Sequence, residues 1–428
     1  MKVISLNTEQ APPISVPLRF FISAPLFLLL AALILVSGAY NPFADIHSPA
    51  LLGATHCITL GFMAMIMMGA MQQILPVVIG SPMPASRLIT WLSFLPLIIG
   101  ALLFPAGFIL GKPVLLNLAW PILGMAFITF ISASLISLAH SPAHNATKTA
   151  ILLSILTLGG AITMGILLAH GYATGSLIPY TRLATAHISL SLGGWVLLLI
   201  IGVSYQVVPM FQLTPNYPKW LTRSLAPAIF FVLVLNLLTL LLDPGLQWVA
   251  IVAQSLFWFF AGCFAVATLL LQSKRRRRVA DATLSFFRLG MTALLCTALL
   301  SLATLYFPLI DHLGTLTAIL FLLGFAMSLI HGMLYKIVPF LVWFHLFRGG
   351  VKRGVPNMKE IIPEAWMWRH LWLHRSTLLA ALFAPWWYPA AWLVALGLQL
   401  QGMLLGYALL IAIAVYRRTL ERIDRDSP

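Results

Sequence analysis

The sequence predicts an all-α membrane protein of about twelve transmembrane helices, from its composition, its apolar segments and a repeated motif. The 428-residue chain is 61% hydrophobic and only 8% charged, with a mean hydropathy of +0.99. A soluble domain carries roughly 25% charged residues, so this chain cannot cover a water-facing surface. The composition excludes a soluble globular protein and makes the lipid bilayer the expected surroundings.

Twelve apolar segments follow one another along the chain, each close to the roughly 20 residues that a membrane-spanning helix needs. Their approximate bounds are 18–39, 51–75, 87–109, 114–139, 149–170, 183–210, 224–242, 246–272, 286–307, 313–345, 372–388 and 389–416. The last pair is the least distinct, because Pro385 and Pro389 interrupt it. We expect a single membrane domain over residues 1–428, with a cytoplasmic loop at 346–371.

Lys and Arg residues fall almost entirely on one side of these alternating spans. If the N-terminus is cytoplasmic, the outer side receives only Lys112 and Arg182, and the basic run at 274–278 is cytoplasmic. Cytoplasmic loops of membrane proteins carry an excess of Lys and Arg, so we expect both termini in the cytoplasm and a bacterial inner membrane. This topology accounts for the formal charge of +15 without a nucleic-acid partner.

One motif occurs three times, in spans two, six and ten. It reads G-[FW]-x6-G-x3-[QK]-x2-P and begins at Gly61, Gly194 and Gly324, four spans apart each time. Its two glycines allow close approach of a neighbouring helix or a flat ligand, and its proline ends or kinks the helix. The motif predicts three pseudo-symmetric arcs of four helices. Their approximate bounds are 18–139, 149–272 and 286–416.

Twelve spans in three such arcs resemble subunit I of the haem–copper oxidase superfamily, including its NO-reductase branch and the NnrS-like haem proteins. The resemblance implies a haem cofactor, with copper as a second candidate, and an electron-donor cytochrome or other membrane subunits as partners. It also implies histidine ligands in spans two, six and ten, which hold His56, His187 and His331. The family's His-His pair in span seven is missing, and Ser191 stands where its span-six tyrosine is expected. A complete dinuclear oxygen-reducing centre is therefore not expected.

The histidines are also candidate ligands on chemical grounds, because neutral imidazole binds haem iron, copper and zinc. His56 and His187 lie near the outer starts of their spans, whereas His331 lies deeper. The alternative for each is a ring that only hydrogen-bonds within the bundle. Five others are expected at the cytoplasmic interface: His140, His144, His345, His370 and His374.

Four further residues are secondary candidates for the functional site. Met63 and Met67 share a helical stripe with His56, and thioethers bind haem or Cu(I), although apolar packing is the alternative. Tyr205 shares a face of span six with the motif glycines, where a flat macrocycle is expected to lie. Lys336 is the only charged residue deep in a span and replaces the motif glutamine. It is either functional or extends to the cytoplasmic surface.

These observations favour a haem-binding membrane protein that acts in electron transfer, in the response to NO or metal stress, or in respiratory assembly. Whether it is an oxidoreductase is left open. One alternative is a small-molecule or metal transporter whose path uses an outer histidine layer. That layer comprises His47, His56, His170, His187 and His312. Another alternative is a structural subunit without a cofactor.

Overall fold

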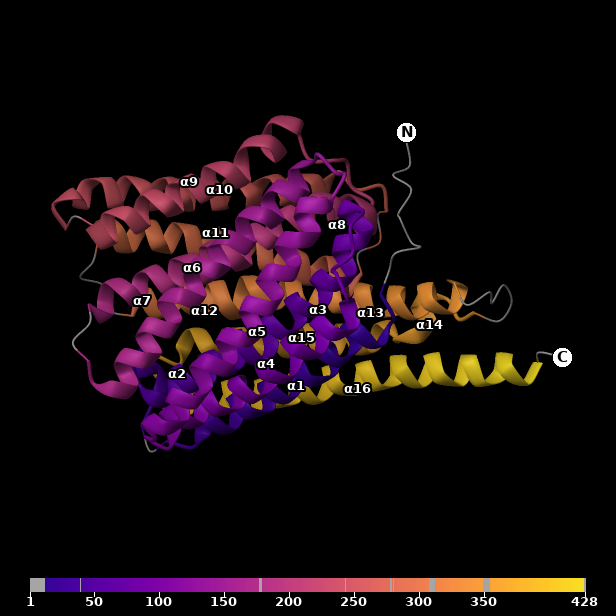
Figure 1. Ribbon diagram of the computed structural model, residues 1–428, viewed down its shortest axis with the longest axis horizontal. Coiled ribbons are helices and arrows are strands. Elements are labelled where there is room, and N and C mark those ends of the chain that lie inside the picture. The colour runs from indigo at the N-terminus through magenta and orange to yellow at the C-terminus, as the bar shows by residue number, and fades with distance from the viewer. Residues whose placement is uncertain are drawn as a thin grey trace. The chain divides into compact units, whose positions relative to one another are not determined.

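The computed structural model describes residues 12–426 except 39, 177–178, 243, 278, 280, 308–311 and 349–354. These residues form helices and no β-strand, which confirms the all-α prediction (Figure 1). The elements are α1 (Ser15–Val36), η2 (Pro42–Ala44), α2 (Pro49–His56), η3 (Cys57–Ala64), α3 (Met65–Ile74), η4 (Leu75–Ile79), α4 (Ser86–Ile109), α5 (Pro113–His140), α6 (Ala146–Thr174), α7 (Tyr180–Ile188), η5 (Ser189–Val196), α8 (Leu197–Gln212), α9 (Lys219–Leu242), η6 (Pro244–Leu246), α10 (Gln247–Ser273), α11 (Ala282–Tyr306), α12 (Leu313–Ile319), η7 (Leu320–Met327), α13 (Ser328–Arg348), α14 (Met358–Ile361), α15 (Glu364–Phe383) and α16 (Tyr388–Asp426).

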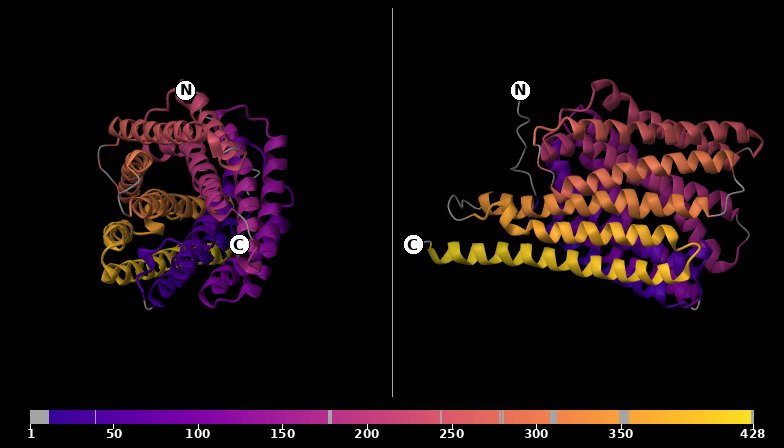
Figure 2. Two further views of the ribbon diagram at one scale, coloured as in Figure 1. Left: turned by 90° about the vertical axis from the view of Figure 1, so that its left-hand side faces the viewer. Right: turned by 180° about the vertical axis from the view of Figure 1, so that it is seen from behind.

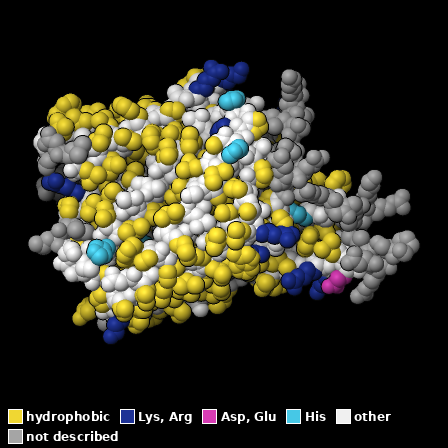
Figure 3. Space-filling model, in the orientation of Figure 1, with side chains coloured by type: hydrophobic (Ala, Val, Ile, Leu, Met, Phe, Trp, Pro, Cys, Tyr) yellow, Lys and Arg dark blue, Asp and Glu magenta, His cyan; other side chains and the backbone are white. Residues whose placement is uncertain are grey.

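Eleven helices within the described residues are long and apolar enough to cross a membrane, and they correspond to predicted spans one to ten and twelve. Large apolar side chains are exposed on them, including Trp220, Phe231 and Phe259. Hydrophobic side chains also make up much of the surface seen in Figure 3. Exposed apolar area of this extent marks contact with another apolar phase, so the chain has the character of an integral membrane protein.

The helix at the predicted eleventh span is shifted towards the N-terminus. It was expected at 372–388, but α15 begins eight residues earlier, at Glu364, and ends at Phe383. Residues 364–371 therefore belong to a helix and not to the predicted loop at 346–371, while residues 349–354 of that loop lie outside the described residues. Polar residues such as Arg369 and Arg375 lower the hydropathy of α15, and it is not among the eleven.

The chain divides into two compact units. Unit 1 comprises Met1–Pro12, Ala70–Arg278 and Met291–Ala318, and unit 2 comprises Pro13–Gly69, Val279–Gly290 and Ile319–Pro428. Within unit 1, α5 packs on α4 and α6, and α9 packs on α10. Within unit 2, α16 lies beside α1 and α15, and it extends beyond them towards the C-terminus (Figure 2).

The three copies of the sequence motif share an unusual backbone. Each has an eight-residue π-helical segment around its first glycine, in η3, η5 and η7. π-helical segments are rare and are frequent at functional sites. The motif helices are also the most enclosed, with 83, 61 and 78% of their apolar windows buried against at most 56% in the other eight candidate spans. The motif thus marks the same local structure three times.

The second glycine of each motif copy is a helix-packing position. A Cβ added at Gly69, Gly202 or Gly332 would lie 2.7 to 2.9 Å from the Cβ of a residue in α1, α6 or α11 respectively. Those partners are Phe20, Ala150 and Phe286. In span six the first glycine is likewise covered by α6, through a threonine side chain. A neighbouring helix therefore fills the glycine face of span six, and the macrocycle expected there is not accommodated.

The motif proline ends two of the three helices. The helical segments that contain Pro76 and Pro209 end three residues later, at Ile79 and Gln212, as the sequence predicts. The helix that contains Pro339 instead continues to Arg348. The third copy therefore extends its helix further than the other two.

Candidate functional site

Three imidazoles meet in the interior of unit 2: His331 on α13, and His370 and His374 on α15. The ring centroid of His331 lies 4.3 Å from that of His370 and 5.2 Å from that of His374. All three residues are buried, with relative exposures of 0, 0 and 1%. We call these three residues the histidine cluster.

The cluster contains one predicted ligand, His331, and two histidines that were expected at the cytoplasmic interface of the membrane. That placement of His370 and His374 is wrong, because α15 starts at Glu364 and both residues lie inside the helix. The four-residue spacing of His370 and His374 was the feature of the sequence that could have identified them as a pair. Residues four apart lie on one face of a helix, the arrangement by which histidine pairs bind zinc in other helices.

His374 is held at both of its ring nitrogens. Its Nδ1–H donates to the Gln401 Oε1 at 2.8 Å, and the Gln401 amide donates to the Thr377 hydroxyl at 2.9 Å. Because a carbonyl oxygen only accepts, Nδ1 carries the proton and Nε2 carries the lone pair. The Ser328 hydroxyl donates to this Nε2 at 2.9 Å.

The ring nitrogens of His331 and His370 have fewer hydrogen-bond partners than those of His374. His370 Nδ1 hydrogen-bonds the Tyr335 hydroxyl at 2.8 Å. His370 Nε2 and both ring nitrogens of His331 have no hydrogen-bond partner among the described residues. Leaving a buried polar atom without a partner costs about 1–3 kcal/mol. Three such nitrogens on adjoining rings make the histidine cluster the candidate site for a ligand.

Two phenylalanine rings line the histidine cluster. The Phe286 ring lies 5.7 to 6.0 Å from all three imidazoles, and the Phe62 ring lies 5.2 Å from His331. None of the ring or hydrogen-bond contacts described for the cluster comes from Asp or Glu. In this arrangement the described His, Cys, Asp and Glu side chains include no group of three or more placed to hold a metal ion.

The other two predicted ligands lie outside the cluster. His56 is in unit 2 and His187 is in unit 1. Each donates its Nδ1–H to a backbone carbonyl, His56 to Leu52 at 2.8 Å and His187 to Ala161 at 2.9 Å. This tautomer leaves Nε2 as the lone-pair nitrogen, which is the form that ligates a metal. Their assignment as haem ligands stays a prediction.

The methionine stripe was predicted from an α-helical period, and the role of Met63 and Met67 as ligands stays a prediction. Met63 and Met67 are buried, as either interpretation requires. However, η3 (Cys57–Ala64) lies between His56 and Met67 and is π-helical. A π-helix bonds residue i to i+5 and turns less per residue than an α-helix, so the α-helical period that aligned these residues is wrong here.

Tyr205 belongs to an aromatic contact in unit 1. Its buried hydroxyl has no hydrogen-bond partner in the described structure, and its ring lies 5.3 Å from that of Tyr217. The Tyr217 hydroxyl is 2.9 Å from that of Thr268. Tyr217 lies in the connection between α8 and α9, and burial raises its pKa. Tyr205 therefore packs beside a polar contact and is not part of the histidine cluster.

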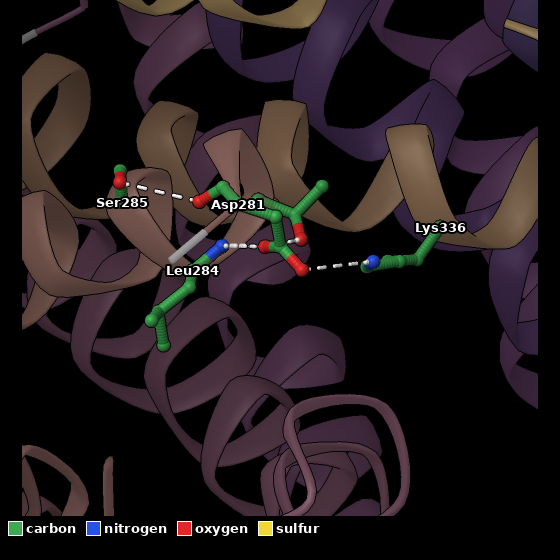
Figure 4. Close-up of polar contacts among 5 residues, drawn as sticks. Asp281, Leu284, Ser285 and Lys336 are labelled. Carbon is green, nitrogen blue, oxygen red and sulfur yellow. Dashed lines mark hydrogen bonds and ion pairs between the residues drawn. The ribbon is translucent and has the colours of Figure 1, made fainter. Parts of the chain in front are cut away.

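Lys336 has an acidic partner that the sequence pattern did not assign. Its Nζ lies 3.4 Å from Asp281 Oδ2 (Figure 4). Asp281 precedes α11 as its N-cap, and its Oδ1 accepts the Leu284 N–H at 2.8 Å. In the second motif copy the cap of α6 is Asn145, and Gln206 takes the place of Lys336. The ion pair therefore replaces two neutral residues, which favours a structural role.

We expect Asp281→Asn and Lys336→Gln each to lower stability by about 1–3 kcal/mol, since each removes one charge of a partly buried ion pair. The double variant should lose less than the sum, because it restores the neutral pattern of the second copy. Thermal unfolding of the four proteins in detergent measures this coupling. Strictly additive losses would contradict the pairing.

No protein-family model and no curated protein matches this sequence. Membership of the haem–copper oxidase superfamily therefore stays a proposal.

Proposed function

We propose that this chain is an integral membrane protein that binds a transition-metal centre, haem or copper, at the histidine cluster. His331 and His370 are the first ligands. The observation that carries the proposal is the three unpartnered imidazole nitrogens on these two fully buried rings. Binding to a metal satisfies such nitrogens where the protein does not.

The surroundings of the rings fit this role. Ligating histidines usually engage their second nitrogen in a hydrogen bond that fixes the tautomer and the ring direction. Tyr335 makes that contact with His370, and Gln401 makes it with His374. Both partners are buried, so they hold the imidazoles without competition from water.

The depth of the cluster supports a role inside the membrane. His331 lies near the middle of the candidate span Leu313–Phe347, and His374 lies near the middle of α15. With α15 as the eleventh of twelve spans, the metal sits deep in the bilayer. Burial of a metal centre tunes its potential. This position suits electron transfer, a response to NO or metal stress, or respiratory assembly, with a cytochrome or another membrane subunit as partner.

The shared motif supports the oxidase-like architecture of the proposal. Its three copies have the same π-helical segment and the same contact with the preceding helix of the arc. We propose three arcs of four helices with both termini in the cytoplasm of a bacterial cell. The Lys and Arg distribution gives this orientation.

Reporter fusions test the topology. Fusions after residues 45 and 280 should give opposite readings, because an odd number of proposed spans separates the two points. Fusions after residues 386 and 426 should also be opposite, with the second cytoplasmic. Equal readings in the second pair would remove α16 from the proposed spans, and opposite readings with the first one cytoplasmic would remove α15.

The metal content of the purified chain tests the function. The protein is expressed with copper and a haem precursor supplied, then analysed by optical absorption and by elemental mass spectrometry. We expect close to one metal centre per chain. A chain that carries neither haem nor a transition metal after such expression would refute the proposal.

A further inference from the structure

A cavity in unit 2 lies between α14 and the charged end of α16, and it shares no residue with the histidine cluster. It has a volume of about 520 Å³, which lies within the roughly 300–1,000 Å³ of typical ligand pockets. We propose that this cavity binds the headgroup of a phospholipid that carries both a phosphate and a primary ammonium group, as phosphatidylethanolamine does. The proposal does not depend on the metal centre. The lining residues are Val355, Pro356, Glu360, Arg418, Thr419 and Arg422.

The position of the cavity along α16 corresponds to the level of lipid headgroups. The sequence carries no Lys, Arg, Asp or Glu from Tyr388 to Tyr416, which is about 43 Å of helix at 1.5 Å per residue. A bilayer with its headgroup layers is about 40–45 Å thick. Trp386 and Trp387 are exposed just before this uncharged run, as expected at one membrane interface. Arg418 follows the end of the run, so the cavity belongs to the opposite interface.

An exposed apolar stripe on α16 leads to the cavity. Leu400 and Tyr407 are exposed, and they stand eighteen and eleven residues before Arg418. Eighteen residues make five turns of an α-helix and eleven make about three, so the three side chains share one helix face. A lipid whose acyl chains lie along this stripe brings its headgroup to Arg418. The stripe therefore favours a lipid over a water-soluble phosphate compound.

Two guanidinium groups on the wall of the cavity suit a phosphate. Arg418 and Arg422 are about one turn apart on α16, and both line the cavity. Residues four apart lie on the same face of a helix. The planar guanidinium binds phosphate oxygens through paired N–H donors, and basic pockets beside membrane helices bind lipid headgroups by this chemistry.

A carboxylate on the α14 side of the cavity favours a zwitterion over a purely anionic headgroup. The Oε2 of Glu360 accepts the Asn357 N–H at 3.0 Å, which orients the carboxylate. Glu360 and Arg418 line the same cavity, yet within the described part of the chain no ion pair joins them. A zwitterion satisfies both charges, because its ammonium group donates to the carboxylate while its phosphate accepts from the guanidinium groups. The quaternary ammonium of phosphatidylcholine has no N–H to donate.

Lipid binding by the full-length protein in detergent tests the proposal. Native mass spectrometry measures the affinities of phosphatidylethanolamine, phosphatidylglycerol and phosphatidylcholine with identical acyl chains. We expect the first to bind about threefold more tightly than the others, the effect of one exposed charge pair. Arg418→Gln should weaken the binding of all three about fivefold, the factor for one basic residue at a lipid surface. Glu360→Gln should weaken phosphatidylethanolamine alone, because it removes the partner of the ammonium group.

Two residues outside the cavity provide matched controls. Arg369→Gln removes a guanidinium that lies over the Trp366 ring, and Glu364→Gln removes a carboxylate from the first turn of α15. Neither should change the lipid preference. Glutamine also serves in a capping box, so Glu360→Gln should keep α14 intact. The main readout is the ratio of the affinities for phosphatidylethanolamine and phosphatidylglycerol, because a loss of folded protein lowers both equally.

Three results would overturn the proposal. An unchanged ratio in Glu360→Gln would show that the carboxylate does not recognise the ammonium group. Equal weakening by Arg369→Gln and Arg418→Gln would show that the lipids respond to the general surface charge and not to the cavity. Binding of O-phosphoethanolamine, the water-soluble headgroup, as tight as that of the whole lipid would show that the apolar stripe holds no acyl chain.

Discussion

Replacing His331 with leucine is expected to remove about nine-tenths or more of the bound metal, since loss of even an outer partner of a ligand typically costs about 10- to 100-fold in affinity. The same substitution should raise the thermal stability of the metal-free protein. It removes two buried nitrogens that have no partner among the described residues, each at a cost of about 1–3 kcal/mol. Metal analysis and thermal unfolding of the same preparations measure the two effects.

The opposite signs of the two effects separate a ligand from a packing residue. His345→Leu on the same helix serves as the control, because His345 Nδ1 bonds the carbonyl of Leu341 and lies outside the cluster. It should keep its metal. If His331→Leu retains full metal content, His331 is not a ligand, and the proposal loses its first residue.

Replacing Gly202 with leucine is expected to prevent stable packing of α8 against α6. A Cβ there would lie 2.7 Å from Ala150 Cβ and 3.4 Å from the Thr147 carbonyl oxygen. Neither atom is the end of a flexible side chain, so the helices must separate. Forcing extra methylenes into a packed core costs about 1–3 kcal/mol and occasionally more. We expect a large loss of monodisperse protein in detergent and a lower unfolding temperature.

Gly159 on α6 is the matched control, because a Cβ there would meet no atom within 4 Å. Gly159→Leu should be neutral or stabilising by up to about 1 kcal/mol, since glycine is a poor helix former. Comparable yields and unfolding temperatures for Gly202→Leu and Gly159→Leu would show that the motif glycine is not a helix contact.

Composition and periodicity were sufficient for the fold class. Apolar runs of about 20 residues predict membrane-spanning helices, and ten of the first eleven predicted spans match helices nearly in place. The motif, which is visible in the sequence alone, also marks the three most enclosed helices. The exception among the spans was α15, where Arg369, His370 and His374 are typical of a loop. Their polarity is compatible with a helix because the imidazoles of α15 point into the protein.

The sequence by itself determined the helices, their repeat and the choice of His331 as a candidate, because these depend on local composition and spacing. Only the tertiary structure decided which groups meet. It placed His370 and His374 against His331, and Asp281 against Lys336. Such contacts depend on how helices distant in sequence pack and rotate, and a π-helical segment changes that rotation without a clear mark in the composition. The periodicity of the sequence therefore located the helices, whereas the packing of α11, α13 and α15 formed the site.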